Sequence, residues 1–193
     1  MIPAKRRIAL SIMAVIAAVG VAWAPVAAAP LVREAYSWED AGTWDDCGIP
    51  LTFEAHGRGL FMLKMGRAGD PTPYLSDNYE WHWINRNPAN GKWFAEDGNG
   101  LYKDARIVNV EGTLYSFEAI EVGRPYVITS MDGDRVLWDR GLLRYQFDVD
   151  TQGDSDLDND EHLTFQLIAE HSAHPIWHQT FEEYCELVLD LVG

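Results

Sequence analysis

Alternation of apolar and polar residues is the feature that most restricts how this chain of 193 residues can fold. Tyr79, Trp81 and Trp83 are spaced two apart with polar residues between them, which is the period of a β-strand with one buried face. Comparable runs begin at Leu51 and recur as far as Ala169. Because short connections join only antiparallel neighbours, we expect an all-β fold, an antiparallel β-barrel or β-sandwich of about nine strands with a short C-terminal helix.

Glycine, proline and asparagine mark the connections between these strands. Residues 87–92 read Asn-Pro-Ala-Asn-Gly-Lys, and residues 132–133 read Asp-Gly, a pair typical of tight turns between antiparallel strands. Residues 56–59, His-Gly-Arg-Gly, predict a hairpin turn, and residues 123–125, Gly-Arg-Pro, predict another break. The polar and aromatic residues 30–46 follow no period, so we expect an irregular segment before the first strand.

The end of the chain has a helical pattern instead. Thr180 is followed three residues later by Glu183, which is the spacing of a helix-initiating capping box. The apolar residues that follow share one stripe of a helix, and they include Phe181, Tyr184, Cys185 and Val188. We therefore expect the short C-terminal helix here, with Cys185 on its buried side.

The first 29 residues have the layout of a secretory signal peptide. Lys5, Arg6 and Arg7 precede an apolar run over residues 8–23, and three alanines at 27–29 match a cleavage site. An uncleaved membrane anchor is the alternative that the length of the run leaves open. We expect residues 1–29 to be removed and residues 30–193 to form a single β-rich globular domain. This domain would be secreted or held in the cell envelope, without a stable membrane span.

The chain is strongly acidic, with 15 basic and 30 acidic residues and a formal net charge of −15. The predicted signal peptide contains three of the basic residues and none of the acidic ones, so 12 basic and 30 acidic side chains remain, which gives −18. A surface of this overall charge repels nucleic acid and anionic lipid. We expect no nucleic-acid partner and a monomer, and the sequence identifies no other partner.

Cys47 and Cys185 are the two cysteines of the chain. Export would place them in an oxidising compartment, where pairing is expected, and no CxxC spacing indicates redox catalysis. The disulfide would close a loop of 138 residues and stabilise the fold by at most about 5 kcal/mol in chain-entropy terms. A pair of buried free thiols is the alternative.

An acidic run over residues 148–161 is the strongest candidate for a metal-binding site in the sequence. Calcium binds several oxygen ligands from a flexible loop, and this run offers candidate ligands in Asp148, Asp150, Asp154, Asp156 and Asp158. The spacing matches an EF-hand only in part, because Asn159 stands where a start at Asp148 requires a bidentate glutamate. Ca²⁺ is the single cofactor that the sequence suggests, and the alternative is that this run is a solvated acidic hairpin loop.

Few other residues are candidates for ligand binding, metal binding or catalysis. Trp81 and Trp83 are candidate ligand-binding residues, although strand alternation also suits them to the core. His171, His174 and His178 have loose spacing with Pro175 between them, which favours a polar loop over a zinc site. The motifs of serine hydrolases, P-loop proteins and dinucleotide-binding proteins are absent from the sequence, so no catalytic residue is assigned.

Together these motifs resemble the small exported proteins of unknown function that are common in actinobacteria. The likeness rests on the signal peptide, residues 47–53 (Cys-Gly-Ile-Pro-Leu-Thr-Phe), the 87–92 turn, the acidic loop and the late Cys185. The resemblance implies an all-β body with one disulfide, and it supplies no catalytic residues. The additional aspartates of the acidic loop depart from the Gly-Thr and proline residues usual in that group.

We interpret the chain as an exported, non-enzymatic β domain with a binding or envelope-associated role, stabilised by one disulfide. The alternative is a small-ligand-binding barrel, or a hydrolase, with a cavity lined by tryptophan and carboxylate side chains. An accessible interior lined by Trp81 or Trp83 would favour the alternative, and a filled interior would favour the first interpretation.

Overall fold

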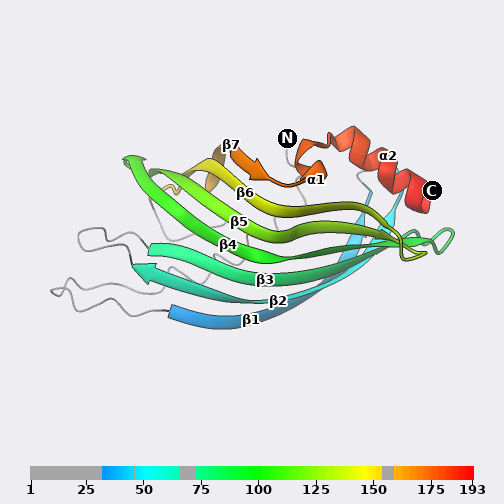
Figure 1. The fold of residues 1–193 in the computed structure, drawn as a ribbon. Helices are drawn as coiled ribbons and strands as arrows, with labels where there is room; N and C mark the ends of the chain where they lie inside the picture. The colour runs from blue at the N-terminus through cyan, green and yellow to red at the C-terminus, as the bar shows by residue number, and fades with distance from the viewer. Residues whose placement is uncertain (1–31, 46, 66–72, 154–158) are drawn as a thin grey trace.

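The computed structural model describes residues 32–45, 47–65, 73–153 and 159–193, so the predicted signal peptide lies outside the described residues. Seven strands form one antiparallel sheet in which each strand pairs with the next along the chain. Two helices, α1 and α2, follow the last strand (Figure 1). The strands are β1 (Val32–Trp44), β2 (Leu51–Met65), β3 (Pro73–Arg86), β4 (Trp93–Glu111), β5 (Leu114–Ser130), β6 (Arg135–Asp150) and β7 (Glu161–His171), and the helices are α1 (Pro175–His178) and α2 (Phe181–Val192).

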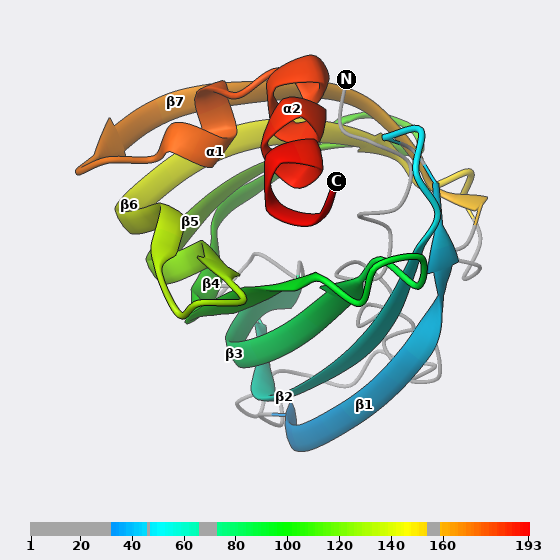
Figure 2. The same ribbon diagram turned by 90° about the vertical axis from the view of Figure 1, so that its right-hand side faces the viewer.

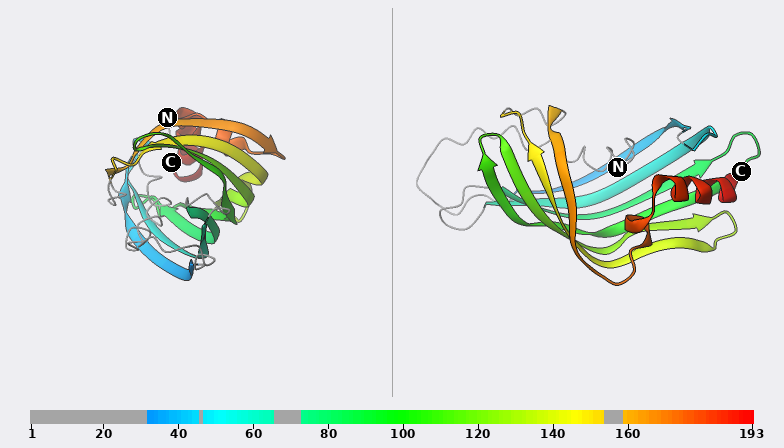
Figure 3. Two further views of the ribbon diagram at one scale, coloured as in Figure 1. Left: turned by 90° about the vertical axis from the view of Figure 1, so that its left-hand side faces the viewer. Right: turned by 90° about the horizontal axis from the view of Figure 1, so that it is seen from above.

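The sheet is strongly curved, and α2 lies within its concave side (Figures 2 and 3). The expected all-β antiparallel fold with a short C-terminal helix is confirmed. The expected closure into a barrel does not occur and about nine strands are not confirmed, because the described residues form one open sheet of seven strands with β1 and β7 at its edges. No helix in the described part of the chain has the length and apolar character needed to cross a membrane.

Three local features of the sheet differ from the expectations. The hairpin turn predicted at residues 56–59 lies inside β2, and residues 123–125 form an irregularity inside β5. Residues 32–44, expected to be irregular, form the edge strand β1, whose side chains are mostly exposed on both faces. An edge strand with little burial has no need of an alternating pattern, so the sequence does not reveal it.

Glycines inside the strands make room for aromatic rings from neighbouring strands. In one row across the sheet the register partners alternate between tryptophan and glycine, and in the next row between tyrosine and glycine. A Cβ atom on Gly57 would lie 2.5 Å from the Trp38 ring, and a Cβ on Gly98 would lie 2.3 Å from Nε1 of Trp81. The rings of β1 and β3 thus fill the space where β2 and β4 would otherwise have side chains. The first row consists of Trp38, Gly57, Trp81 and Gly98, and the second row of Tyr36, Gly59, Tyr79 and Gly100.

Helix α2 builds one of two hydrophobic clusters on the concave side. Val188 and Val192 are fully buried against the sheet residues Leu51, Phe94 and Ile128. The predicted capping box is confirmed, since Thr180 accepts from the Glu183 amide while the Glu183 side chain accepts from the Thr180 amide. A second cluster forms where Trp177 of α1 stacks on Tyr145 and Phe165.

The predicted disulfide is confirmed and attaches α2 to the start of the sheet. Cys47, in the segment between β1 and β2, is bonded to Cys185 of α2, with a Cα–Cα separation of 5.0 Å. Cys47 packs against the cluster of Leu51, Phe94 and Ile128, and Cys185 lies in the helix that covers this cluster. The bond therefore holds α2 over its own hydrophobic contact.

The predicted turn at residues 87–92 is confirmed, and it also caps α2. The Asn87 side-chain amide donates to the Val192 carbonyl at 2.8 Å, and the Lys92 ammonium donates to the Gly193 carbonyl at 2.8 Å. Asn90 donates to Val192 as well, at 3.0 Å. The last carbonyls of a helix have no partner within the helix, so this turn supplies donors that α2 lacks. The turn between β3 and β4 and the C-terminus accordingly lie at the same end of the molecule (Figure 1).

Replacing Asn87 with alanine tests this cap. Asn87 is buried, so Asn87→Ala would remove one of the two side-chain donors to the Val192 carbonyl and the acceptor of the Ala89 amide, and should lower the free energy of unfolding by about 1–3 kcal/mol. Urea denaturation measures the change, and Asn78→Ala, at an exposed position on β3, should change stability by less than about 0.5 kcal/mol. Equal effects of the two substitutions would contradict the capping role.

A second substitution tests the pairing of glycine with aromatic rings. Gly98→Ala would place a methyl group 2.3 Å from Trp81 and 2.5 Å from the Pro125 carbonyl, a backbone atom that cannot move aside freely. We expect a loss of about 1–3 kcal/mol in the free energy of unfolding, as for other overpacked sites. Gly42→Ala on the edge strand meets only the Phe53 ring, at 2.8 Å, and should cost clearly less. A Gly98 variant as stable as the Gly42 variant would show that the ring positions are not restrictive.

Candidate functional site

The two faces of the sheet differ in charge. We call the concave side that packs α2 the inner face, and the opposite side the outer face. The register places carboxylates but no lysine or arginine of the seven strands on the inner face. All ten basic residues of the strands lie on the outer face, and they are Arg33, Arg58, Lys64, Arg86, Lys103, Arg106, Arg124, Arg135, Arg140 and Arg144.

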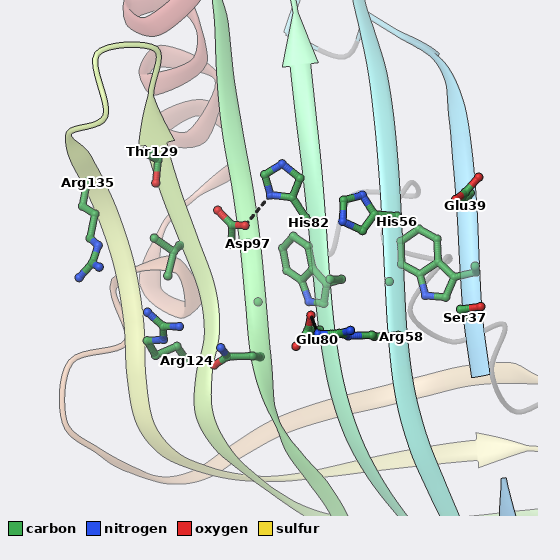
Figure 4. Close-up of a pocket in the computed structure, with 16 residues that line it drawn as sticks. Ser37, Glu39, His56, Arg58, Glu80, His82, Asp97, Arg124, Thr129 and Arg135 are labelled. Carbon is green, nitrogen blue, oxygen red and sulfur yellow. Dashed lines mark hydrogen bonds and ion pairs between the residues drawn. The ribbon is translucent and has the colours of Figure 1, made fainter. Parts of the chain in front are cut away.

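A hollow of about 940 Å³ on the outer face is the candidate site, and we call it the outer groove (Figure 4). It extends across the strands from β1 to β6. Its lining includes side chains of both charges, polar side chains and histidines. The charged and histidine members are Glu39, His56, Arg58, Glu80, His82, Asp97, Arg124 and Arg135.

Strand pairing brings these side chains together in two rows. Glu39, His56, His82 and Asp97 are successive register partners across β1 to β4, and Ser37, Arg58, Glu80 and Asn99 form the adjacent row. Partners on one face of a sheet have Cβ atoms about 5 Å apart, so each row is a continuous line of polar groups. The residues come from distant parts of the sequence, and the register alone unites them.

Two interactions order the floor of the groove. Nδ1 of His82 lies 2.5 Å from Oδ1 of Asp97, and the Arg58 guanidinium lies 2.7 Å from the Glu80 carboxylate. The His56 ring lies beside that of His82, with 5.3 Å between centroids. Because these side chains are substantially exposed, the ion pairs contribute little to stability. They hold donors and acceptors in fixed positions that a ligand can use.

The predicted ligand-binding tryptophans face the other way. Trp81 and Trp83 share one face, as the alternation indicated, and that face is the inner one. The Trp81 ring packs against Tyr126 with 5.4 Å between centroids, and the Trp83 ring packs against Phe53 with 4.6 Å. Trp81 is among the residues of the outer groove only as part of the β3 strand that forms its floor. A ligand-binding role for these two residues stays a prediction.

The predicted calcium ligands are described only in part. Asp148 accepts a hydrogen bond from Thr164 at 2.7 Å, and Asp150 accepts one from the Gln152 amide at 3.0 Å. Hydrogen bonds hold the pKa of each carboxyl below its usual range, and the main cause is the Thr164 side chain for Asp148 and the Thr113 side chain, ahead of the Gln152 amide, for Asp150. The other three candidates, Asp154, Asp156 and Asp158, lie outside the described residues.

Within residues 32–45, 47–65, 73–153 and 159–193, no group of three or more histidine, cysteine, aspartate or glutamate side chains is arranged to hold a metal ion. His178 is paired with Glu170 at 2.8 Å, and His174 is buried with a contact to the His171 carbonyl. Calcium binding by the acidic loop therefore stays a prediction.

The inner face contains a polar layer that sequence reasoning missed. Each of four carboxylates accepts a hydrogen bond from one or more tyrosine hydroxyls, in the pairs Tyr36 with Asp77, Tyr79 with Glu121, Tyr102 with Asp104, and both Tyr126 and Tyr184 with Glu96. Burial raises the pKa of Asp77 and Asp104 above the usual range, in spite of the hydroxyls that favour ionisation. Burial also raises the pKa of four of these tyrosines, so they remain protonated donors, and the four are Tyr36, Tyr79, Tyr102 and Tyr184. The only sequence signal was the two-residue spacing of Asp77 from Tyr79 and of Tyr102 from Asp104.

The geometry therefore defines an open, helix-capped antiparallel sheet with a mixed-charge groove on its outer face. Neither a protein-family model, nor a curated protein, nor a solved structure matches the chain. The function has to be inferred from the groove and the charge distribution themselves.

The inner polar layer predicts a particular dependence of stability on pH. Because burial raises the pKa of Asp77 in the folded state, protonation of this carboxyl favours folding. Its contribution is complete below the unfolded pKa of about 4 and is lost as the pH rises through the raised folded pKa. We expect the wild type to lose stability relative to Asp77→Asn as the pH rises from about 4 through the raised folded pKa.

Asp77→Asn is a suitable comparison, because the amide oxygen can still accept from Tyr36, and the other carboxyl oxygen has no hydrogen-bond partner among the described residues. Urea denaturation across this pH range measures the difference between the two proteins. Asp132→Asn, in the exposed turn between β5 and β6, is the control and should follow the wild type at every pH. A constant difference between wild type and Asp77→Asn would refute the shifted pKa.

Proposed function

We propose that this chain is an exported, non-catalytic binding domain and that the outer groove is its ligand site. The observation that carries the proposal is the groove itself, a hollow of about 940 Å³ in which paired charges and histidines line up across neighbouring strands. The signal-peptide pattern of residues 1–29 supports export, and the Cys47–Cys185 disulfide suits an oxidising compartment.

Rigid strands and exposed polar groups suit binding better than catalysis. The groove side chains stand on a continuous sheet, so their spacing is set by strand pairing and needs no rearrangement on ligand binding. His82 and Asp97 are 33% and 44% exposed, so water reaches both groups. Efficient acid–base catalysis uses groups whose pKa values are shifted by burial in a site that excludes water.

A second candidate function rests on one observation. His82 is held by Asp97 at 2.5 Å and lies beside His56, an arrangement in which one imidazole can accept a proton while another donates one. This favours a hydrolase as the alternative, with His56 and His82 as the acid–base pair. Turnover of a bound ligand that is lost in His82→Ala would support the alternative over simple binding.

The groove can be tested with a matched pair of variants. Arg58→Ala/Glu80→Ala removes an ion pair inside the groove, and Arg144→Ala/Glu118→Ala removes an ion pair on the same face outside it. A glycan array and pull-down with cellulose, chitin and peptidoglycan provide the ligand survey. For any probe that the wild type binds, we expect the groove variant to bind at least about tenfold more weakly, because charge-assisted hydrogen bonds are lost, and the control to be unchanged. Equal binding by both variants, or no binding to any probe, would contradict the proposal.

A further inference from the structure

We infer that the outer groove binds an anionic polysaccharide, with the acidic groups of the sugar chain held at the β5–β6 side. This inference rests on the proposed function and adds the chemical class of the ligand. The guiding observation is the separation of charge between the two faces, since all ten basic residues of the strands lie on the outer face. Strand carboxylates such as Glu39, Glu54, Glu80, Asp97 and Glu118 share this face, so it attracts anions only where arginines have no acidic partner.

The groove is itself polarised from one side to the other. Arg124 and Arg135 lie at its β5–β6 side, and Glu39 lies at its β1 side (Figure 4). In the middle of the groove the charges compensate one another, because Arg58 is paired with Glu80 and His82 with Asp97. The uncompensated positive charge is therefore at the β5–β6 side.

Three arginines on the outer face of β5 and β6 have no side-chain partner in the described part of the chain, two of them adjacent and the third further along β6. Arg124 and Arg140 are neighbours, because Gly123 pairs with Gly141 in the β5–β6 register, and Arg135 pairs with Thr129 of the groove. None of the three guanidinium groups has a hydrogen bond or ion pair to a described side chain, whereas Arg144 further along β6 is bound to Glu118. A free guanidinium presents a planar set of donors that matches a carboxylate or phosphate group.

An exposed tryptophan stands between the arginines. Trp138 is 42% exposed, and it lies on the outer face of β6 between Arg135 and Arg140. Its register partner Val127 lines the groove, so the ring continues the groove surface. A flat indole face can contact the apolar face of a sugar ring while its edge remains in water. Arginine and tryptophan together fit a sugar that carries an acidic substituent.

The rest of the groove favours a polysaccharide over nucleic acid. The carboxylates of Glu39, Glu80 and Asp97 accept hydrogen bonds from hydroxyl groups, which every sugar unit offers. The same carboxylates repel a backbone that has one phosphate on every nucleotide. A chain with many hydroxyls and spaced acidic groups satisfies both sides of the groove.

Dextrans that differ only in their substituents provide a matched test. Isothermal titration of the purified protein with carboxymethyl-dextran, dextran phosphate and unmodified dextran compares acidic chains with a neutral chain of the same backbone, and single-stranded DNA is included as a competing polyanion. We expect at least about tenfold tighter binding of one or both acidic dextrans than of unmodified dextran or DNA, with the preferred acidic group identifying the substituent. Binding should weaken as salt is added.

Variants then locate the acidic groups. Arg124→Ala/Arg140→Ala and Trp138→Ala should each weaken binding of the acidic dextran at least about tenfold. Arg33→Ala/Arg106→Ala removes two exposed arginines from the same face away from the groove and should leave binding unchanged. Circular dichroism confirms that each variant is folded.

Where a dextran binds, three results would overturn the inference. They are equal or tighter binding of unmodified dextran, tighter binding of DNA than of either acidic dextran, and an Arg124/Arg140 variant that binds acidic dextran as the wild type does. If a neutral glycan binds and Arg58→Ala/Glu80→Ala abolishes that binding while the Arg124/Arg140 variant does not, the groove remains the ligand site and the acidic ligand class fails. Absence of binding by all dextrans overturns the ligand class, and the wider glycan survey then decides the proposed function.

Discussion

The docking of α2 on the concave side of the sheet is the interaction on which the rest of the structure depends. An open sheet buries its inner face only where something covers it, and α2 covers the end formed by Leu51, Phe94 and Ile128. The helix is held in three ways, by its hydrophobic stripe, by the disulfide through Cys185 and by the amide of Asn87 at its last turn. A native disulfide of this kind contributes about 2–5 kcal/mol, a large share of the stability of a single domain. These contacts hold α2 against residues of β2, β4 and β5, which are also strands of the outer groove.

Local signals in the sequence predicted the structure well, and signals that depend on distant neighbours did not. The turn at residues 87–92, the capping box at Thr180 and the pairing of the two cysteines follow from short motifs and are confirmed. The turn expected at residues 56–59 is absent, because Gly57 and Gly59 stay extended beneath rings from β1. Nothing within residues 56–59 shows that an aromatic ring from another strand occupies the space beside them. Closure into a barrel is likewise a property of the whole sheet, and no single strand encodes it.

The residues of the outer groove could not be chosen from the sequence, because each resembles an ordinary solvent-facing residue of its strand. Only the register shows that Glu39, His56, His82 and Asp97 form one line. The candidate ligand-binding tryptophans, Trp81 and Trp83, are packed on the inner face. The charge separation between faces was nevertheless encoded within single strands. Arg140 and Arg144 occupy the same parity on β6, while the buried Asp139 occupies the other.

The alternation of rings and glycines across β1 to β4 has a consequence for how such a sheet can evolve. Each ring extends over the glycine that pairs with it on the next strand, so one side chain fills the space at both positions. A mutation at either position alone leaves a void or a collision, whereas a compensating change at both preserves the packed volume. Descendants of this sequence can therefore exchange the order, with the ring on β2 and the glycine on β1, and retain the same curved sheet. Sequences that diverged in this way would differ from this chain by paired substitutions at Trp38 and Gly57, or at Tyr36 and Gly59.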